Sequence, residues 1–101
     1  MPQTGDFTEY ALLAQLRTPD IQNPQELAAI WGPIQQECSE VGAEIIDSYA
    51  SLGQYDFLII LNAPSRDICF KASMIMERHG LDVQTMELMS TDAFGAVVED
   101  I

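Results

Sequence analysis

The sequence predicts one small α+β domain, built on a four-stranded antiparallel sheet with its helices on one face. Short apolar runs of strand length alternate with helix signals in the order β-α-β-β-α-β. The length of 101 residues suits a single domain. A hydrophobic content of 48% and a mean hydropathy of +0.05 are typical of a globular chain.

The first strand is predicted over residues 10–16, where an apolar run interrupted only by Gln15 follows a polar start. Residues 1–8 contain Gly and Pro among polar side chains, so we expect a flexible lead-in before a single domain over 9–101. Thr18-Pro19-Asp20 ends the strand, because proline lacks a backbone donor and restricts the residue before it.

A helix is predicted to begin at Asn23-Pro24, since asparagine caps helices and proline suits their first position. Pro33 beside Gly32 predicts a kink or a break into two segments, and Gly42 marks the end. One apolar stripe at helical spacing faces the core: Leu27, Ile30, Trp31, Ile34, Cys38 and Val41.

Two strands follow over residues 44–52 and 55–62, joined by a tight turn at Gly53-Gln54. Ser65 is predicted to cap a second helix that runs to His79. The remaining elements are a C-cap at Gly80, a fourth strand over residues 81–90 and a short last helix from Thr91-Asp92 through Val98.

This order is that of the ferredoxin-like fold, in which two helices cover one side of the sheet. The strand over residues 55–62 alternates apolar side chains on both of its faces, and so does the first strand. An antiparallel sheet open to water has one polar face, so a further layer must cover this one. A second copy is the simplest cover, which predicts a homodimer or a higher oligomer.

Sixteen acidic residues oppose four basic ones and give a net charge of −12. This charge repels phosphates and anionic lipids, so we expect neither nucleic acid nor a membrane as a partner. The excess of carboxylates, with one lysine, Lys71, is what adaptation to high intracellular salt would require. A solvated surface that keeps the protein soluble is the simpler alternative.

The sequence shows no targeting segment, and its longest apolar stretch, Phe57 to Leu61, is too short to cross a bilayer. Cys38 and Cys69 fall among apolar neighbours in predicted helices. We expect free, buried thiols and a cytoplasmic location, with a disulfide as the less favoured alternative.

At Gly53-Gln54-Tyr55-Asp56 the chain resembles the GYD family, whose signature Gly-x-Tyr-Asp stands here as Gly53, Tyr55 and Asp56. Asn62-Ala63-Pro64 supports the resemblance, which extends over roughly residues 9–95. A further mark is the spacing of Gly80, Val83, Thr85 and Leu88. The resemblance implies a ferredoxin-like fold of the dimeric α+β barrel kind, in which two sheets pack face to face. It implies architecture and almost no chemistry.

The chain departs from the family pattern after the first strand. There the family carries a Thr-x-x-Gly turn, and this sequence reads Thr18-Pro19-Asp20-Ile21. A function that resides in that loop does not transfer from the family to this chain.

The signature itself has a structural and a functional interpretation. In the first, Gly53 supplies backbone freedom, Tyr55 packs and Asp56 binds backbone amides. In the second, Tyr55 and Asp56 form an acid/base or ligand-binding pair. Neighbouring strand residues point to opposite faces, which favours the structural interpretation.

No catalytic set, cofactor motif or metal-ligand spacing is recognisable. His79 is the single histidine and sits at a helix end, where the helix dipole accounts for it. We therefore predict no cofactor and no metal. Met74, Met76, Met86 and Met89 fill the core or an interface, or line an apolar ligand cavity.

Three hypotheses remain open. The first is a homodimeric binding or sensor module for a small apolar or amphipathic ligand between sheet and helices. Its candidate pocket residues are Tyr10, Tyr49, His79, Met76 and Met86. The second is a cofactor-independent enzyme that uses Tyr10, Tyr49, Asp56 or His79. The third is a structural or interaction unit.

Overall fold

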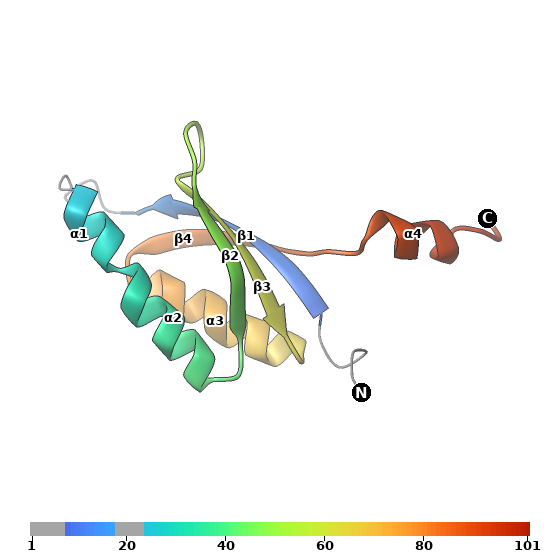
Figure 1. Ribbon diagram of the computed structural model, residues 1–101, viewed down its shortest axis with the longest axis horizontal. Coiled ribbons are helices and arrows are strands. Elements are labelled where there is room, and N and C mark those ends of the chain that lie inside the picture. Colours follow the sequence, from blue (N-terminus) through green and yellow to red (C-terminus); the bar gives the residue numbers. More distant parts are fainter. Residues whose placement is uncertain (1–7, 18–23) are drawn as a thin grey trace.

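The computed structural model describes residues 8–17 and 24–101, and it shows an α+β fold with one four-stranded antiparallel sheet (Figure 1). The predicted α+β class and antiparallel sheet are confirmed. In chain order the elements are β1 (Thr8–Leu16), α1 (Pro24–Ala29), α2 (Trp31–Glu40), β2 (Glu44–Ala50), β3 (Phe57–Ala63), α3 (Arg66–Arg78), β4 (Leu81–Glu87) and α4 (Thr91–Val97). The strand order is β2-β3-β1-β4, and each neighbouring pair is antiparallel.

Three predictions fall wholly or partly outside the described residues. They are the lead-in over 1–8, of which only Thr8 is described and already belongs to β1, the break at Thr18-Pro19-Asp20 and the cap at Asn23. The departure from the family pattern at residues 18–21 also lies there.

The predicted break in the first helical segment is confirmed and lies at Ile30, between α1 and α2. Pro33 is the third residue of α2. In the first turn a backbone N–H has no partner within the helix, so proline loses nothing there. The break before Trp31 thus places Pro33 where a helix tolerates it.

Side-chain caps and glycines mark the two ends of α3, the start of α4 and the end of α2. Ser65 caps α3, as predicted, and its Oγ accepts a hydrogen bond from the Ile68 N–H at 3.2 Å. Ser90 caps α4, and its Oγ accepts a hydrogen bond from the Ala93 N–H at 3.0 Å. Residue 90 therefore belongs to the start of α4, and β4 ends at Glu87, three residues earlier than predicted. Gly42 and Gly80 follow α2 and α3 with φ angles of +98° and +97°. No helix within the described ranges has the length and apolar character needed to span a membrane.

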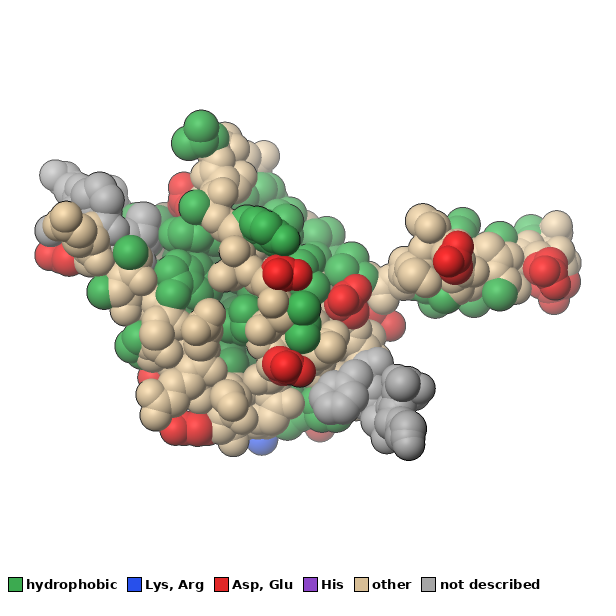
Figure 2. Space-filling model, viewed as in Figure 1, with side chains coloured by type: hydrophobic (Ala, Val, Ile, Leu, Met, Phe, Trp, Pro, Cys, Tyr) green, Lys and Arg blue, Asp and Glu red, His purple; other side chains and the backbone are tan. Residues whose placement is uncertain are grey.

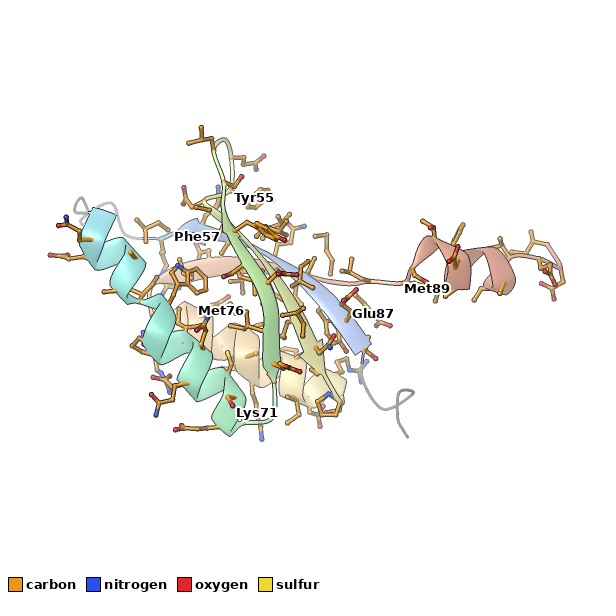
Figure 3. The ribbon with its side chains drawn as sticks, in the orientation of Figure 1. Tyr55, Phe57, Lys71, Met76, Glu87 and Met89 are labelled. Atoms are coloured by element: carbon orange, nitrogen blue, oxygen red, sulfur yellow. The ribbon has the colours of Figure 1, made fainter. Side chains whose placement is uncertain are left out.

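The core lies between the sheet and the pair α2 and α3, which both pack on one of its faces (Figure 1). Met76 of α3 is fully buried in this layer (Figure 3), and Trp31 meets Phe57 edge to face with ring centroids 4.9 Å apart. Cys38 and Cys69 are free and buried here, as predicted. The other fully buried large side chains are Leu12, Ile34, Ile59, Leu61 and Leu81.

The hairpin between β2 and β3 differs from the prediction of a tight turn. β2 ends at Ala50 and β3 begins at Phe57, so residues 51–56 form the connection. Tyr55 and Asp56 lie in this connection rather than in the strand. Their side chains bind other strands, which explains why the loop is longer than a two-residue turn.

Candidate functional site

The face of the sheet opposite the helices is apolar in its centre. The strand registers place Tyr49, Leu58 and Leu13 in one row across β2, β3 and β1. Ile60, Ala11 and Met86 form part of the next row across β3, β1 and β4. The exposed fractions of Tyr49 and Met86 are 53% and 37%. The two-faced pattern predicted for the first and third strands is therefore present in the fold.

Polar side chains border this apolar band. Asp47 lies opposite Ile60, and Glu9 and Glu44 lie on either side of Asn62 at the end of the band. In Figure 2 apolar side chains follow the sheet between the hairpin loop and the projecting C-terminal segment, with carboxylates beside them. An apolar centre with a polar rim is the usual composition of a protein-protein interface.

The signature Gly53, Tyr55 and Asp56 fastens the hairpin loop to the sheet. Gly53 has a φ of +112°, in the region that favours glycine. The Tyr55 hydroxyl donates to Gln84 Oε1 of β4 at 2.7 Å, and Asp56 Oδ2 accepts from the Leu16 N–H at 2.7 Å. Tyr55 and Asp56 thus bind different strands and share no pocket, which supports the structural interpretation of the signature.

A groove of about 570 Å³ lies between α3 and the edge strand β4, on the helix side of the sheet. Its apolar wall consists of Cys69, Phe70, Met74 and Val83. Phe70 and Met74 are 66% and 62% exposed and lie one helical turn apart, so together they form an exposed apolar patch. The polar groups that line it are Tyr10, Arg66, Ser73, Glu77, Thr85 and Glu87.

The buried polar groups of the groove are uncharged at neutral pH. Burial raises the pKa of the Tyr10 hydroxyl, and Cys69 and Glu87 raise it further, while a hydrogen bond with Thr8 and the charge of Arg66 oppose them. Burial also raises the pKa of the Cys69 thiol. Tyr10 is therefore a neutral hydroxyl, and Cys69 lacks the thiolate that a nucleophile needs.

A separate polar cluster joins α2 to the end of α3. The Glu37 carboxylate contacts Arg78 and lies 3.2 Å from His79 Nε2. The Arg78 hydrogen bond lowers the pKa of Glu37 more than any other contact, and His79 contributes. This cluster fixes one helix to another and contains one histidine and one carboxylate. Within residues 8–17 and 24–101, no three His, Cys, Asp and Glu side chains are grouped to hold a metal ion.

The five candidate pocket residues do not come together. Tyr10 lines the groove, Met76 lies in the core and His79 caps α3 beside Glu37. Tyr49 and Met86 lie on the opposite face of the sheet. The residues considered for catalysis, Tyr10, Tyr49, Asp56 and His79, do not come together either. The remaining one of these, Asp56, binds the Leu16 N–H at the end of β1.

Of the residues that line the groove, the sequence reasoning had proposed only Tyr10 and Met74 for a cavity. The lining residues that it did not propose for a pocket are Arg66, Cys69, Phe70, Ser73, Glu77, Val83, Thr85 and Glu87. The available signal was on the second helix. Its buried stripe is Cys69, Ala72, Ile75 and Met76, and Phe70 and Met74 fall outside that stripe at a spacing of four residues. A pair of large apolar side chains outside the core stripe marks a second apolar surface.

The family of the chain follows from a comparison with protein-family models. The model of the GYD domain matches residues 10–98. The protein belongs to the GYD domain family. The match covers both the core and the signature loop, and the resemblance noted at Gly53, Tyr55 and Asp56 is confirmed. A search of curated proteins found no match.

Proposed function

We propose that this GYD-domain protein is a homodimeric binding module that holds a small amphipathic ligand in the groove between α3 and β4. The groove carries the proposal, because it joins an apolar wall to a few convergent polar groups, as ligand sites do. The strand order supports a ferredoxin-like domain, and two such domains would pack their uncovered sheet faces together as a dimeric α+β barrel.

The lining of the groove suggests the class of ligand. Glu87 lies directly opposite Tyr10 in the pairing of β1 with β4, and Arg66 lines the same groove, so these three groups supply polar contacts in it. Phe70, Met74 and Val83 supply apolar wall. A ligand with an aliphatic or aromatic body and a head group that both donates and accepts hydrogen bonds fits this arrangement.

The dimer is argued from the uncovered face. The side chains of Leu13, Leu58 and Ile60 are partly exposed to water in a single chain, because the helices pack on the other face of the sheet. Removing such side chains from water yields about 25 cal/mol for each Å² buried. A second copy offers the same surface, which closes a two-fold contact without further growth. The free, buried thiols of Cys38 and Cys69 accord with the cytoplasmic location that we propose.

The groove is tested with 8-anilinonaphthalene-1-sulfonate, which has an aromatic body and an anionic head. We expect saturable fluorescence enhancement, weakened about tenfold by Phe70→Ser because the apolar wall is lost. Leu52→Ser is the matched control, since Leu52 is fully exposed at the hairpin tip. Equal binding by both variants, or none by the wild type, would overturn the groove as a site. Native mass spectrometry of the purified protein then identifies any ligand it retains.

The dimer is tested by sedimentation velocity. The wild type should sediment as a dimer at micromolar concentration, and Ile60→Asp should sediment as a folded monomer because a charge then lies in the interface. Phe70→Ser should remain dimeric, since Phe70 lies on the opposite side of the sheet. A wild-type monomer across all salt concentrations contradicts the dimer.

A further inference from the structure

The edge strand β4 turns only half of its backbone groups toward the sheet. At one end of its pairing with β1 the Leu88 N–H donates to the Glu9 carbonyl at 2.8 Å, and at the other the Arg17 N–H donates to the Gly80 carbonyl at 2.9 Å. The register between these two bonds has no shift. Alternate pairs of an antiparallel ladder are hydrogen-bonded, so the even-numbered residues of β4 bond to β1 and the odd-numbered residues direct their N–H and C=O groups to the open edge.

The residues that face the open edge include Val83, Thr85 and Glu87, whose side chains line the groove beside α3. Within residues 8–17 and 24–101 their backbone groups have no hydrogen-bond partner. The Thr85 hydroxyl lies 2.9 Å from the Ser73 hydroxyl, a contact that joins α3 to β4. The groove therefore combines an apolar wall with a row of open backbone donors and acceptors.

The other edge of the sheet is less suited to a new strand. β2 forms that edge, and its register with β3 shifts between Ile45 and Asp47. A bulge of this kind interrupts the row of backbone groups and twists an edge away from a new partner. β4 pairs with β1 over seven residues without a shift, so it is the regular edge of the sheet.

The apolar wall has the spacing of an extended chain. Phe70 and Met74 lie one turn apart on α3, which corresponds to a rise of about 6 Å along the helix. Alternate residues of a strand advance by about 6.6 Å and point to the same side. Two alternate side chains of a strand added to β4 would therefore meet Phe70 and Met74 in turn.

The charges of the groove select a basic partner. Glu87 is the last residue of β4 and lies at one end of the groove. Glu77 lies toward the other end, because Arg17 bonds both its carbonyl and the side chain of Asp82 near the start of β4. Arg66 is the one cation among the lining residues. With two carboxylates against one guanidinium on a chain of charge −12, the groove attracts a segment with basic ends and repels an acidic one.

We propose that the groove binds a short extended peptide of a partner protein, with apolar side chains at its centre and basic ones at its ends, as an additional strand antiparallel to β4. Its amides pair with Val83, Thr85 and Glu87, and its alternate side chains pack on Phe70 and Met74. The inference deepens the proposed function and rests on it, because the amphipathic ligand of the groove is then a peptide. The proposed sheet-to-sheet dimer leaves this site open, since the groove lies on the helix side of the sheet.

Fluorescence anisotropy with the labelled peptide Lys-Thr-Val-Thr-Val-Thr-Lys tests this mode of binding in the full-length protein. The lysines and valines of this peptide are the alternate residues that face the groove. We expect saturable binding with a Kd below about 1 mM, weakened about tenfold by Phe70→Ser and unchanged by Leu52→Ser. No saturation with the wild type overturns the inference, and equal binding of a peptide with Glu in place of both Lys overturns the basic class of the partner.

Two N-methylated forms of this peptide separate strand pairing from general attraction between opposite charges. Methyl groups on both valine nitrogens remove the N–H groups that face β4, so binding should weaken at least about tenfold. Methyl groups on the first two threonine nitrogens give the same charge and size but point away from β4, so binding should be retained. Equal binding by the two forms overturns the added strand.

Hydrogen exchange identifies what occupies the edge. In the free protein the amides of Val83 and Thr85 should exchange at least about tenfold faster than those of Gln84 and Met86, which bond to β1. The peptide should slow Val83 and Thr85 and leave the other two unchanged. Slow exchange of Val83 and Thr85 in the free protein shows that a second copy or another segment of the chain already pairs with β4, and it overturns the inference.

The result is separable from that of the proposed function. Dye binding that Phe70→Ser weakens, without any peptide binding, retains the groove as a small-molecule site and overturns the peptide alone. Loss of both dye and peptide binding overturns the groove itself. A wild-type monomer in sedimentation removes the dimer and leaves the peptide site intact, because all its residues belong to one chain.

Discussion

At the scale of single residues, the chain uses its few basic groups to fix its helices. The carboxylate of Glu37 on α2 contacts both Arg78 and His79 at the end of α3. The sequence has four Lys and Arg residues and one His, so two of these five side chains meet at one carboxylate. His79 was predicted to owe its position to the helix dipole. His79 does lie at the end of α3, and it also contacts the Glu37 carboxylate of α2, a partner that the sequence spacing does not reveal.

This contact makes part of the stability depend on pH. The pKa of Glu37 in the fold is below its usual value of 4.5, first because of Arg78 and then because of His79. The contribution is therefore complete above pH 4.5 and is lost as pH falls through the lower folded value. Urea unfolding measured from neutral to acidic pH should show a smaller acid loss for Glu37→Gln than for the wild type. Glu99→Gln, which removes an exposed carboxylate outside the cluster, is the control, and an equal change in both variants argues against this role.

At the scale of elements, the loop between β2 and β3 is held by contacts to strands that are distant in sequence. Asp56 bonds through both its backbone and its side chain, since its N–H donates to the Ala14 carbonyl and Oδ2 accepts from the Leu16 N–H. Tyr55 reaches Gln84 on β4. The family signature therefore stabilises the end of the sheet where β1, β3 and β4 meet.

Removal of the Asp56 carboxylate should destabilise the fold rather than remove a reactive group. Asp56→Ala leaves the partly buried Leu16 N–H without its acceptor, which costs about 1–3 kcal/mol in the free energy of unfolding. Asp56→Asn keeps an oxygen acceptor and should lose less. Urea denaturation gives both values, and a loss for Asp56→Ala no larger than that for Asp100→Ala, an exposed carboxylate, would contradict the assignment.

At the scale of the whole molecule, the net charge of −12 opposes both compaction and association. Carboxylates occur on the rim of the apolar sheet face, where Glu44 and Asp47 of one copy would approach a partner of the same sign. Salt shortens the range of this repulsion from about 10 Å at 0.1 M to about 3 Å at 1 M. If the acidic surface is an adaptation to concentrated salt, added salt should therefore raise the stability of the fold.

The melting temperature should rise by about 5 °C or more between about 0.1 M and 2 M KCl, which corresponds to about 1 kcal/mol for a chain of this size. Chloride is preferred to sulfate, which strengthens apolar burial in any protein. The variant Glu44→Gln/Asp47→Asn should show a smaller rise because its charge is less negative. A melting temperature that is constant or falls with KCl would count against salt adaptation.

Sequence pattern alone was sufficient for the element order and most helix boundaries. Local chemistry decides these features: Ser65 caps α3, Gly42 and Gly80 follow helices, and Pro33 forces a break. The apolar character of both strand faces also followed from alternation, because side chains of a strand point to opposite faces in turn. The family was recognisable because its signature is contiguous in the chain.

The candidate site depended on tertiary structure. Tyr10 lines the groove, and its neighbours Arg66, Phe70 and Thr85 come from α3 and β4, more than fifty residues along the chain. The predicted companions Tyr49 and Met86 lie on the other face, since the strand registers decide which residues share a side. Sequence determined that this protein has one apolar sheet face more than its helices can cover. Only the tertiary structure decided where the groove lies, because its lining residues come from β1, α3 and β4 and become neighbours only when the strands pair. It also decided that α4 buries none of its residues, which the sequence pattern does not reveal.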